Sequence, residues 1–432
     1  MKKSIVLLAA VLLLSSCAQE NGLYYLDADE SGGKTAQNFS YTHSDDMTPE
    51  YHAQTISDLQ YRDGYLYIDP GDQPIYRYNV ETGNVTCLCT DPVCKHDTAE
   101  CPLRGISSTF YITDSGDLCF YRSFSEPITD VTGTVTDWER TSDFVLLNRE
   151  TMKVKTLESY GVGTGFSNEL YDGDWRYYNG LVYDPETSVD GWGEWGLLKM
   201  NLVTGEWSWF GAQTDENGDP VPIMSAYPLF LWEDRIYFQG TDGIFSLDKN
   251  GENRTEHLSG VFNGYSNFKW DGEYLYRWDS ENRTVMRVPL NGGETETVID
   301  KTALGYSFHM TEKYLYYLAG EDTNLGKARV SGYGAQEVIL PGGEIHRCLH
   351  DGSEDTVVYT FSGEWESVRP VASIVVGNYF YCTYNWWTDA DGDGVFEDGD
   401  HHNSAAINGK KTCTMLRIDL TTGEVMEIEV VG

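Results

Sequence analysis

Basic residues are scarce in this chain of 432 residues, which has 30 lysines and arginines against 68 aspartates and glutamates and a formal net charge of −38. Nucleic acids and anionic lipid surfaces bind basic patches, so this balance argues against nucleic acid as a partner and against electrostatic docking onto lipid headgroups. The excess of negative charge instead favours solubility at a crowded surface, or attraction of cations and basic partners.

Motifs of several enzyme classes are also absent. The chain has no Gly-x-Ser-x-Gly elbow, no Walker loop and no His-Glu-x-x-His motif. The segment HRCLHD (346–351) holds two histidines four residues apart, a spacing that we interpret as incidental in a strand or loop. Carboxylates are too abundant to single out a glycosidase or lyase pair. No catalytic residue is therefore assigned, and a carbohydrate-active enzyme remains an alternative to a non-catalytic protein.

The N-terminus carries a short apolar run. Two lysines precede residues 5–14, a stretch too short to span a bilayer comfortably. The run ends in LSSC, with Cys17 last, which resembles the lipobox of bacterial lipoprotein precursors. The resemblance implies a signal peptide over residues 1–16 and acylation of Cys17. The weak strand pattern that follows predicts that 17–56 acts as a tether or closes the ring. We therefore expect a protein anchored by lipid to the cell membrane, on its extracytoplasmic face; an ordinary signal peptide is the alternative.

Sustained helical periodicity is absent from the remaining sequence, and a short phrase recurs in its place. The phrase is a strand, an Asp-Gly or Asn-Gly type turn and a tyrosine-rich strand, as in YRDGYLYI at 61–68 and KWDGEYLYRW at 269–278. Two further strands around a polar turn follow, as in IYRYNVETGNVTCL at 75–88. Such turns tolerate positive φ, and the flanking alternation is typical of half-buried strands.

Seven copies of this four-strand unit, at a minimum spacing of roughly 40 residues, predict an all-β fold. Because no single sheet of this kind buries both faces, the sheets are expected to stack as blades of a β-propeller over residues 57–432. Seven blades are the first choice. Eight is an alternative if DTVVYTFSGEW within 344–369 is an extra blade, and six is a further one. A β-sandwich does not predict such regular recurrence.

The repeats resemble those of TolB-like bacterial propellers and of the low-density-lipoprotein-receptor propeller. Together with the motif formed by Cys89, Cys94, His96, Cys101 and Pro102, they are similar to surface lipoproteins of anaerobic gut Firmicutes. The resemblance implies a membrane-anchored propeller at the cell surface. It implies no particular activity or ligand.

Long insertions between the predicted strands A to D of each blade indicate the binding surface. They fall on B–C connections (121–144, 184–196 and 384–413) and on D–A connections (89–107, 211–226 and 341–372). Both kinds leave an antiparallel blade on the same side, and function tends to lie on long loops of a rigid scaffold. We expect this face to bind an extracellular glycan, peptide or protein, or to act as the scaffold of a surface complex.

Tryptophans in these insertions are candidate ligand contacts, because aromatic rings stack on sugars and peptides. Packing against the blades is the alternative interpretation. The candidates are Trp138, Trp192, Trp195, Trp386 and Trp387.

The sequence DADGDGVFEDGD at 389–400 has acidic residues at the spacing of a calcium-binding loop, with a glycine at its sixth position. Asp400 replaces the glutamate usual at the last position, and flanking helices are missing. A solvated acidic hairpin is the alternative. The predicted Ca²⁺ ligands are Asp389, Asp391, Asp393, Val395, Glu397 and Asp400.

The loop CLCTDPVCKHDTAEC holds four cysteines and a histidine in one connection. Outside the cytoplasm disulfides are permitted, while three cysteines and His96 also suit a tetrahedral zinc site. Disulfides, Zn²⁺ and free thiols all remain open, and each of the first two would clamp the loop. The residues concerned are Cys87, Cys89, Cys94, His96 and Cys101. A separate disulfide is expected between Cys382 and Cys413.

Overall fold

The computed structural model describes residues 59–431 of the chain except for several short segments. These exceptions are 70–73, 92, 95–100, 104–105, 130–134, 161–168, 183–193, 219, 260–267, 280, 304–307, 331–333, 390–391, 393–394, 398–400 and 405–412. Within the described part, the regular structure is β-strand apart from the 3-10 turn η2 (Gly363–Trp365). No helix there is both long enough and apolar enough to cross a membrane.

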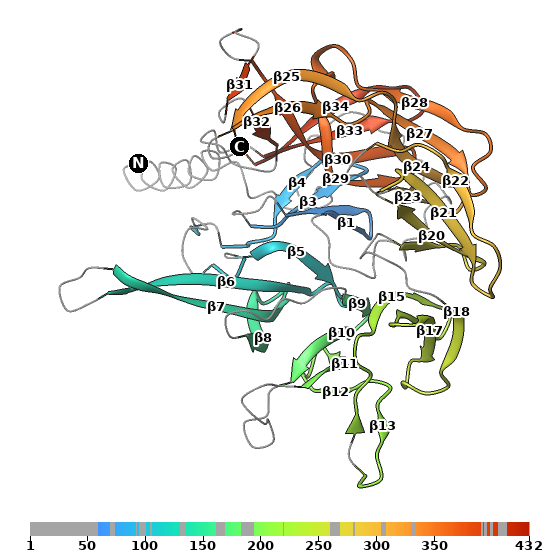
Figure 1. The fold of residues 1–432 in the computed structure, drawn as a ribbon. Helices are drawn as coiled ribbons and strands as arrows, with labels where there is room; N and C mark the ends of the chain where they lie inside the picture. Colours follow the sequence, from blue (N-terminus) through green and yellow to red (C-terminus); the bar gives the residue numbers. More distant parts are fainter. Residues whose placement is uncertain are drawn as a thin grey trace, which may run out of the picture.

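Among the described residues, six four-stranded antiparallel sheets and a seventh, in which β32 is added to four antiparallel strands, are arranged around a common centre (Figure 1). This confirms the predicted β-propeller and agrees with seven blades. Blade 1 contains β1 (Leu59–Arg62), β2 (Tyr65–Ile68), β3 (Tyr76–Asn79) and β4 (Val85–Cys87). Blade 2 contains β5 (Ile106–Ile112), β6 (Leu118–Thr129), β7 (Val135–Asn148) and β8 (Lys153–Tyr160). Blade 3 contains β9 (Glu169–Asp172), β10 (Trp175–Val182), β11 (Glu194–Asn201) and β12 (Trp207–Trp209).

The next three blades repeat the pattern. Blade 4 contains β15 (Tyr227–Trp232), β16 (Arg235–Gln239), β17 (Gly243–Asp248) and β18 (Thr255–Ser259). Blade 5 contains β19 (Phe268–Trp270), β20 (Tyr274–Asp279), β21 (Thr284–Pro289) and β22 (Glu296–Ile299). Blade 6 contains β23 (His309–Met310), β24 (Tyr314–Ala319), β27 (Glu344–Leu349) and β28 (Thr356–Thr360).

Blade 7 contains β29 (Arg369–Val376), β30 (Tyr379–Trp387), β33 (Cys413–Asp419) and β34 (Val425–Val431). Insertions supply the other strands. These are β13 (Gln213–Thr214), β14 (Pro220–Val221), β25 (Thr323–Val330), β26 (Gly334–Leu340), β31 (Val395–Glu397) and β32 (His401–Asn403).

One predicted boundary is wrong. Residues 341–372 were expected to form an insertion or part of an extra blade, but β27 and β28 in this segment are strands C and D of blade 6. The insertion of blade 6 is instead the β25–β26 hairpin, which lies between strands B and C. The hairpin was missed because its own antiparallel strands resemble the strands of a blade.

Strand A of each blade lies innermost, around the axis of the ring (Figure 1). Contacts between blades run through these strands, from β9 to β15 and from β15 to β19. The first and last blades meet through β1 and β29, so the ring closes without exchanging a strand among the described residues. Residues 17–56, which were considered for ring closure, lie outside the described part.

Tight turns join the strands as the sequence predicts. Asp63 and Gly64 link β1 to β2 with φ angles of 51° and 81°, the left-handed pair that a two-residue hairpin requires. In five of the C–D turns a leading Asn or Asp side chain accepts backbone N–H groups of the turn. At Asn79, for example, Gly83 donates its N–H to the Asn79 carbonyl at 2.8 Å, and the Asn79 side chain accepts from the N–H of Thr82 at 2.8 Å.

Buried apolar clusters hold neighbouring blades together. Each junction between two blades around the ring contains such a cluster. Aromatic pairs contribute at several of them. Tyr111 and Tyr171 stack at 4.2 Å between blades 2 and 3, while Phe230 and Trp270 stack at 4.4 Å between blades 4 and 5. The abundance of tyrosine in the repeats is therefore explained by packing between blades.

A buried ion pair crosses the junction of blades 2 and 3. The Arg176 side chain is fully buried and donates to Glu158 at 2.9 Å and to Glu169 at 2.5 Å. Its guanidinium also lies 3.8 Å from the centre of the Tyr178 ring and 4.0 Å from that of Phe144. Charge pairing and ring contacts together replace the hydration that Arg176 loses on burial.

We expect Arg176→Met to lower the free energy of unfolding by about 3–5 kcal/mol, because it leaves the buried Glu169 and the half-buried Glu158 without their cation. Urea denaturation followed by tryptophan fluorescence would measure the loss. Arg254→Met is the control, since the Arg254–Glu256 pair is exposed and should contribute at most about 1 kcal/mol. Equal losses for the two variants would contradict a special role for the buried pair.

Candidate functional site

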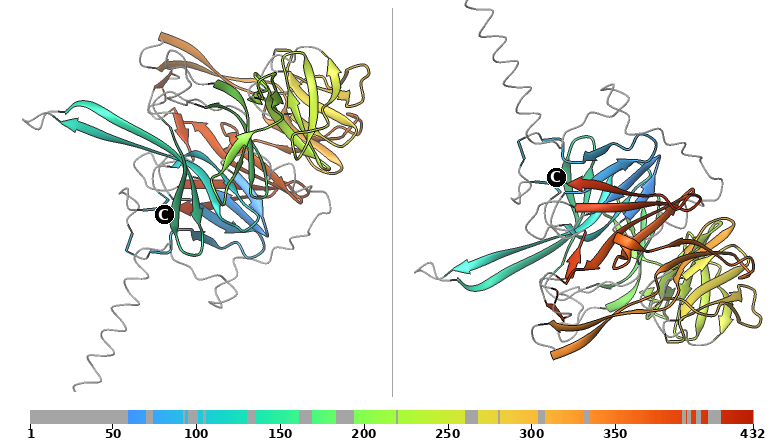
Figure 2. Two further views of the ribbon diagram at one scale, coloured as in Figure 1. Left: turned by 90° about the horizontal axis from the view of Figure 1, so that it is seen from below. Right: turned by 90° about the horizontal axis from the view of Figure 1, so that it is seen from above.

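The long connections leave the disc on the side where strands B end and strands C begin, which we call the insertion face. It carries the outer parts of β6 and β7, the β13–β14 and β25–β26 hairpins, β31, β32 and the cysteine loop. In both views of Figure 2, the β6–β7 hairpin (teal) and the β25–β26 hairpin (orange) project toward the same side of the disc. The predicted clustering of insertions on one face is therefore seen in the structure.

Two insertions combine into a small sheet of their own, which we call the accessory sheet. Strand β31 from blade 7 pairs in parallel with β25 from blade 6, with Lys327 opposite Val395 and Ala328 opposite Phe396, and β26 completes the order β26-β25-β31. Val338, Leu340 and Phe396 form its buried core. The accessory sheet thus joins two blades above the disc through backbone hydrogen bonds and apolar packing.

The candidate tryptophans differ in their surroundings. Trp387 packs edge-on against Phe396 at 5.6 Å, and Trp386 lies 5.4 Å from Tyr384, so both are half-buried supports of the insertion face. Trp195 is 42% exposed at the start of β11 and is available to a ligand. Trp192 and the side chain of Trp138 lie outside the described residues.

The predicted calcium loop connects β30 to the accessory sheet. The Asp389 carboxylate accepts the N–H of Gly392 at 2.8 Å, and Val395 is the first residue of β31. Asp391, Asp393, Asp400 and the side chain of Glu397 lie outside the described part of the chain, so calcium binding stays a prediction.

The cysteine loop brings three of its predicted residues together. The sulfur atoms of Cys89, Cys94 and Cys101 all lie within 4.8 Å of one another. Cys89 and Cys101 are each 2% exposed and belong to the apolar cluster shared by blades 7, 1 and 2, whereas Cys94 is half-buried. A hydrogen bond with Cys89 and burial raise the pKa of Cys101 well above its usual range. His96 lies outside the described residues.

Hydrogen bonds of the backbone hold the loop in place. The carboxylate of Asp91 accepts the N–H of Val93 at 3.0 Å, and its carbonyl accepts the N–H of Cys94 at 3.2 Å. From β6, Arg122 donates to the carbonyl of Cys101 at 2.8 Å. Both ends of the cysteine loop are therefore positioned by groups other than the thiols.

The remaining predicted cysteines do not join this group. Cys87 is buried next to the three thiols, and burial raises its pKa to about 12. No disulfide is present among the described cysteines. Cys382 lies opposite Leu416 on β33 and is a buried free thiol, while the side chain of Cys413, its predicted partner, is not in the described part. Cys17 also lies outside it.

A polar cluster on the axis was not predicted from the sequence. His309, on strand A of blade 6, is hydrogen-bonded through Nε2 to Ser373 Oγ on strand A of blade 7 at 2.8 Å. Lys269, on strand A of blade 5, is close enough to help lower the pKa of His309. We call these three residues the axial cluster. Each comes from a different repeat, so no linear motif in the sequence could have identified it.

Burial dominates the electrostatics of the axial cluster. It lowers the pKa of Lys269 to about 8, and burial together with the charge of Lys269 lowers the pKa of His309 to about 3. At neutral pH, Lys269 is therefore mainly charged and His309 neutral. Among the ion pairs of the described residues, none involves Lys269. The cluster accordingly offers positive charge and hydrogen-bonding groups to an anion.

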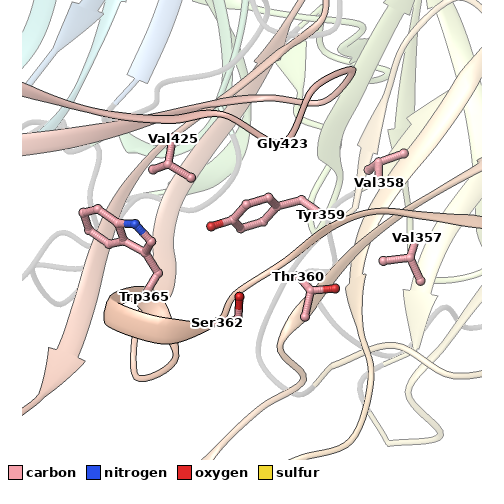
Figure 3. A pocket seen from close by; sticks show the side chains of 8 residues that line it. All are labelled: Val357, Val358, Tyr359, Thr360, Ser362, Trp365, Gly423 and Val425. Carbon is pink, nitrogen blue, oxygen red and sulfur yellow. The ribbon is translucent and has the colours of Figure 1, made fainter.

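A separate groove of about 640 Å³ lies at the outer edge of the ring between blades 6 and 7. Figure 3 shows the side chains of Tyr359 and Trp365 on either side of it, with Val425 beside Trp365. The lining has no carboxylate, histidine, lysine or cysteine, so it does not provide acid–base or metal chemistry. Its full lining is Val357, Val358, Tyr359, Thr360, Ser362, Trp365, Gly423 and Val425.

Comparison with known proteins adds little beyond the fold. No family model matches the chain, and no curated protein matches it. Among solved structures, an oligogalacturonate lyase from Vibrio parahaemolyticus is 9% identical, with coverage of 78% of this chain and 86% of that chain and a TM-score of 0.42. TolB from Acinetobacter baumannii is 13% identical, with coverage of 67% and 61% and a TM-score of 0.33. Similarities this weak carry no argument about activity.

We expect Phe396→Ala to separate β31 from β25, because removing a buried phenylalanine costs about 3–5 kcal/mol and the core of the accessory sheet is small. Hydrogen–deuterium exchange should then become faster in peptides covering 323–330 and 395–397, while the blades keep their protection. The control is Ile339→Ala on β26, whose side chain is 51% exposed. Unchanged exchange in Phe396→Ala would show that the strand pairing does not depend on this core.

Proposed function

We propose that this chain is a lipid-anchored, extracytoplasmic β-propeller that binds an extracellular glycan or peptide through its insertion face, without catalysing a reaction. We further propose that the ligand carries an anionic group that contacts Lys269. The observation that carries this proposal is a half-buried cation on the axis, whose pKa is lowered by loss of solvent and which lies close to the neutral, hydrogen-bonded His309, in a chain whose net charge is −38.

Charge compensation supports an anionic ligand. Lys249, by comparison, pairs with Asp172 at 2.8 Å, whereas Lys269 has no such pair in the described part of the chain. Burying an ammonium group without a counter-charge is unfavourable, as the lowered pKa of Lys269 reflects. A carboxylate of a sugar acid or an acidic side chain would remove this cost on binding.

The position of the axial cluster supports access from the insertion face. Each strand A follows a D–A connection and therefore begins at that face. His309 is the first residue of β23, so it lies near this end of the axis. The accessory sheet and Trp195 stand on the same side and would contact the parts of a ligand that extend beyond the axis.

We also propose that Ca²⁺ binds the loop 389–400 and fixes β31 against β25. The support is the position of the loop between Trp387 and β31, where its conformation sets the geometry of the accessory sheet. Calcium would then act on ligand binding through the accessory sheet, without touching the axial cluster.

Binding should be measured by calorimetry with oligosaccharides of sugar acids, their neutral counterparts, and acidic and neutral peptides, each with calcium and with chelator. We expect acidic members of one class to bind, and Lys269→Met to weaken them at least about tenfold, as loss of one charged hydrogen bond predicts. Lys301→Met, an exposed lysine on the D–A connection after blade 5, is the control and should bind normally.

The outcomes of this experiment distinguish the functional hypotheses. Equal binding by Lys269→Met and the unchanged chain would overturn the axial site. If no oligosaccharide or peptide binds, the result would favour a scaffold with a protein partner. Turnover of a glycan would establish the enzyme alternative. Loss of binding with chelator alone would place the contacts at the accessory sheet.

Binding of the acidic ligand should also depend on pH. The ammonium form of Lys269 is the form that attracts an anion, and its pKa in the unbound protein is about 8. Affinity should therefore fall as pH rises above about 8, by up to about tenfold per pH unit. Lys269→Arg, which stays protonated, should keep its affinity constant over the same range. A fall of equal size in that variant would assign the effect to another group.

A further inference from the structure

We propose that Cys89, Cys94 and Cys101 bind a thiophilic divalent metal ion, zinc in particular. This site is independent of the proposed ligand-binding function. It rests on the convergence of three sulfur atoms, all within 4.8 Å of one another, in the loop between blades 1 and 2, where Cys89 and Cys101 are buried and Cys94 is half-buried.

The spacing of the sulfur atoms suits a metal ion. In a tetrahedral zinc site each sulfur lies about 2.3 Å from the ion, which places the sulfurs roughly 3.8 Å from one another. The three cysteines reach this arrangement after a small contraction. Zinc commonly takes three protein ligands and leaves a fourth position for a further group. The sequence predicts His96 there, but the proposal rests on the three cysteines alone.

The loop presents the thiols before any metal is bound. Cys89 lies two residues after the end of β4 and packs within the apolar cluster. The Asp91 turn positions Cys94, and Arg122 donates to the carbonyl of Cys101. Ligands held by such surrounding contacts lose little conformational entropy on binding. The three sulfur atoms are thus brought together before metal binding by contacts that include the one from Arg122 of blade 2.

A metal ion uses all three thiols, whereas a disulfide does not. A disulfide joins two sulfurs and leaves the third as a thiol packed against the bond. A divalent cation also neutralises thiolates that would repel each other in a buried site. The ion would tie the end of blade 1 to the segment that leads into β5, next to the junction where the ring closes.

The test uses the whole chain, solubilised in detergent and purified under anaerobic, reducing conditions. After removal of metal by a chelator, Zn²⁺ alone is titrated against a chromophoric competitor, and Co²⁺ is used to detect thiolate-to-metal charge-transfer absorption. We expect one equivalent to bind, with a rise in the unfolding temperature. Cys94→Ser should lower the zinc affinity at least about 100-fold and remove the charge-transfer band.

Cys87→Ser is the matched control, because this cysteine is buried two residues from Cys89 and lies outside the group of three. It should bind zinc like the unchanged chain. Circular dichroism of the metal-free forms would show that both variants fold. The proposal is overturned if zinc does not bind, if the two serine variants bind it equally, or if intact mass shows a disulfide between two of the three cysteines in anaerobically isolated protein.

Discussion

A four-stranded sheet with apolar side chains on both faces cannot bury them alone, and the whole fold depends on this constraint. Each blade therefore packs between two neighbours, and the series ends only when the last blade reaches the first. Tyr78 and Tyr381, 6.0 Å apart, belong to the junction where blade 1 meets blade 7. The ring is thus a consequence of sheets that are apolar on both faces. Its many aromatic residues are explained by the large apolar area that each junction between blades buries.

The even number of strands in a blade determines where function can develop. Because four antiparallel strands begin and end on the same side, every D–A connection and every B–C connection leaves the disc at the insertion face. The opposite face has the tight turns, whose geometry is fixed by residues such as Gly64 and Gly83 with positive φ. Insertions are tolerated where the turns are not constrained in this way, and β25 and β31 show how two of them can become one rigid unit.

Local features were predictable from the sequence, because each depends on residues close together in the chain. The Asp63-Gly64 turn, the repeated hairpins and the convergence of cysteines within a single loop are of this kind. The pairing of β25 with β31 was not predictable, since it joins insertions of two different blades. The buried Arg176 was missed for a similar reason. Its two carboxylate partners come from separate strands, and an arginine in a strand usually indicates an exposed position.

The axial cluster and the cysteine loop each concentrate charge of one sign, positive in the axial cluster and potentially negative in the cysteine loop. The buried Arg176 has two carboxylate partners, and the buried Arg369 donates to backbone carbonyls instead. Lys269 lies on an innermost strand close to His309 of blade 6, which is hydrogen-bonded to Ser373 of blade 7, and no described carboxylate pairs with Lys269. The three thiols concentrate potential negative charge beside Arg122, whose guanidinium is directed at a carbonyl. An anion on the axis would compensate the positive charge of Lys269, and a cation in the loop would compensate the negative charge of the thiolates.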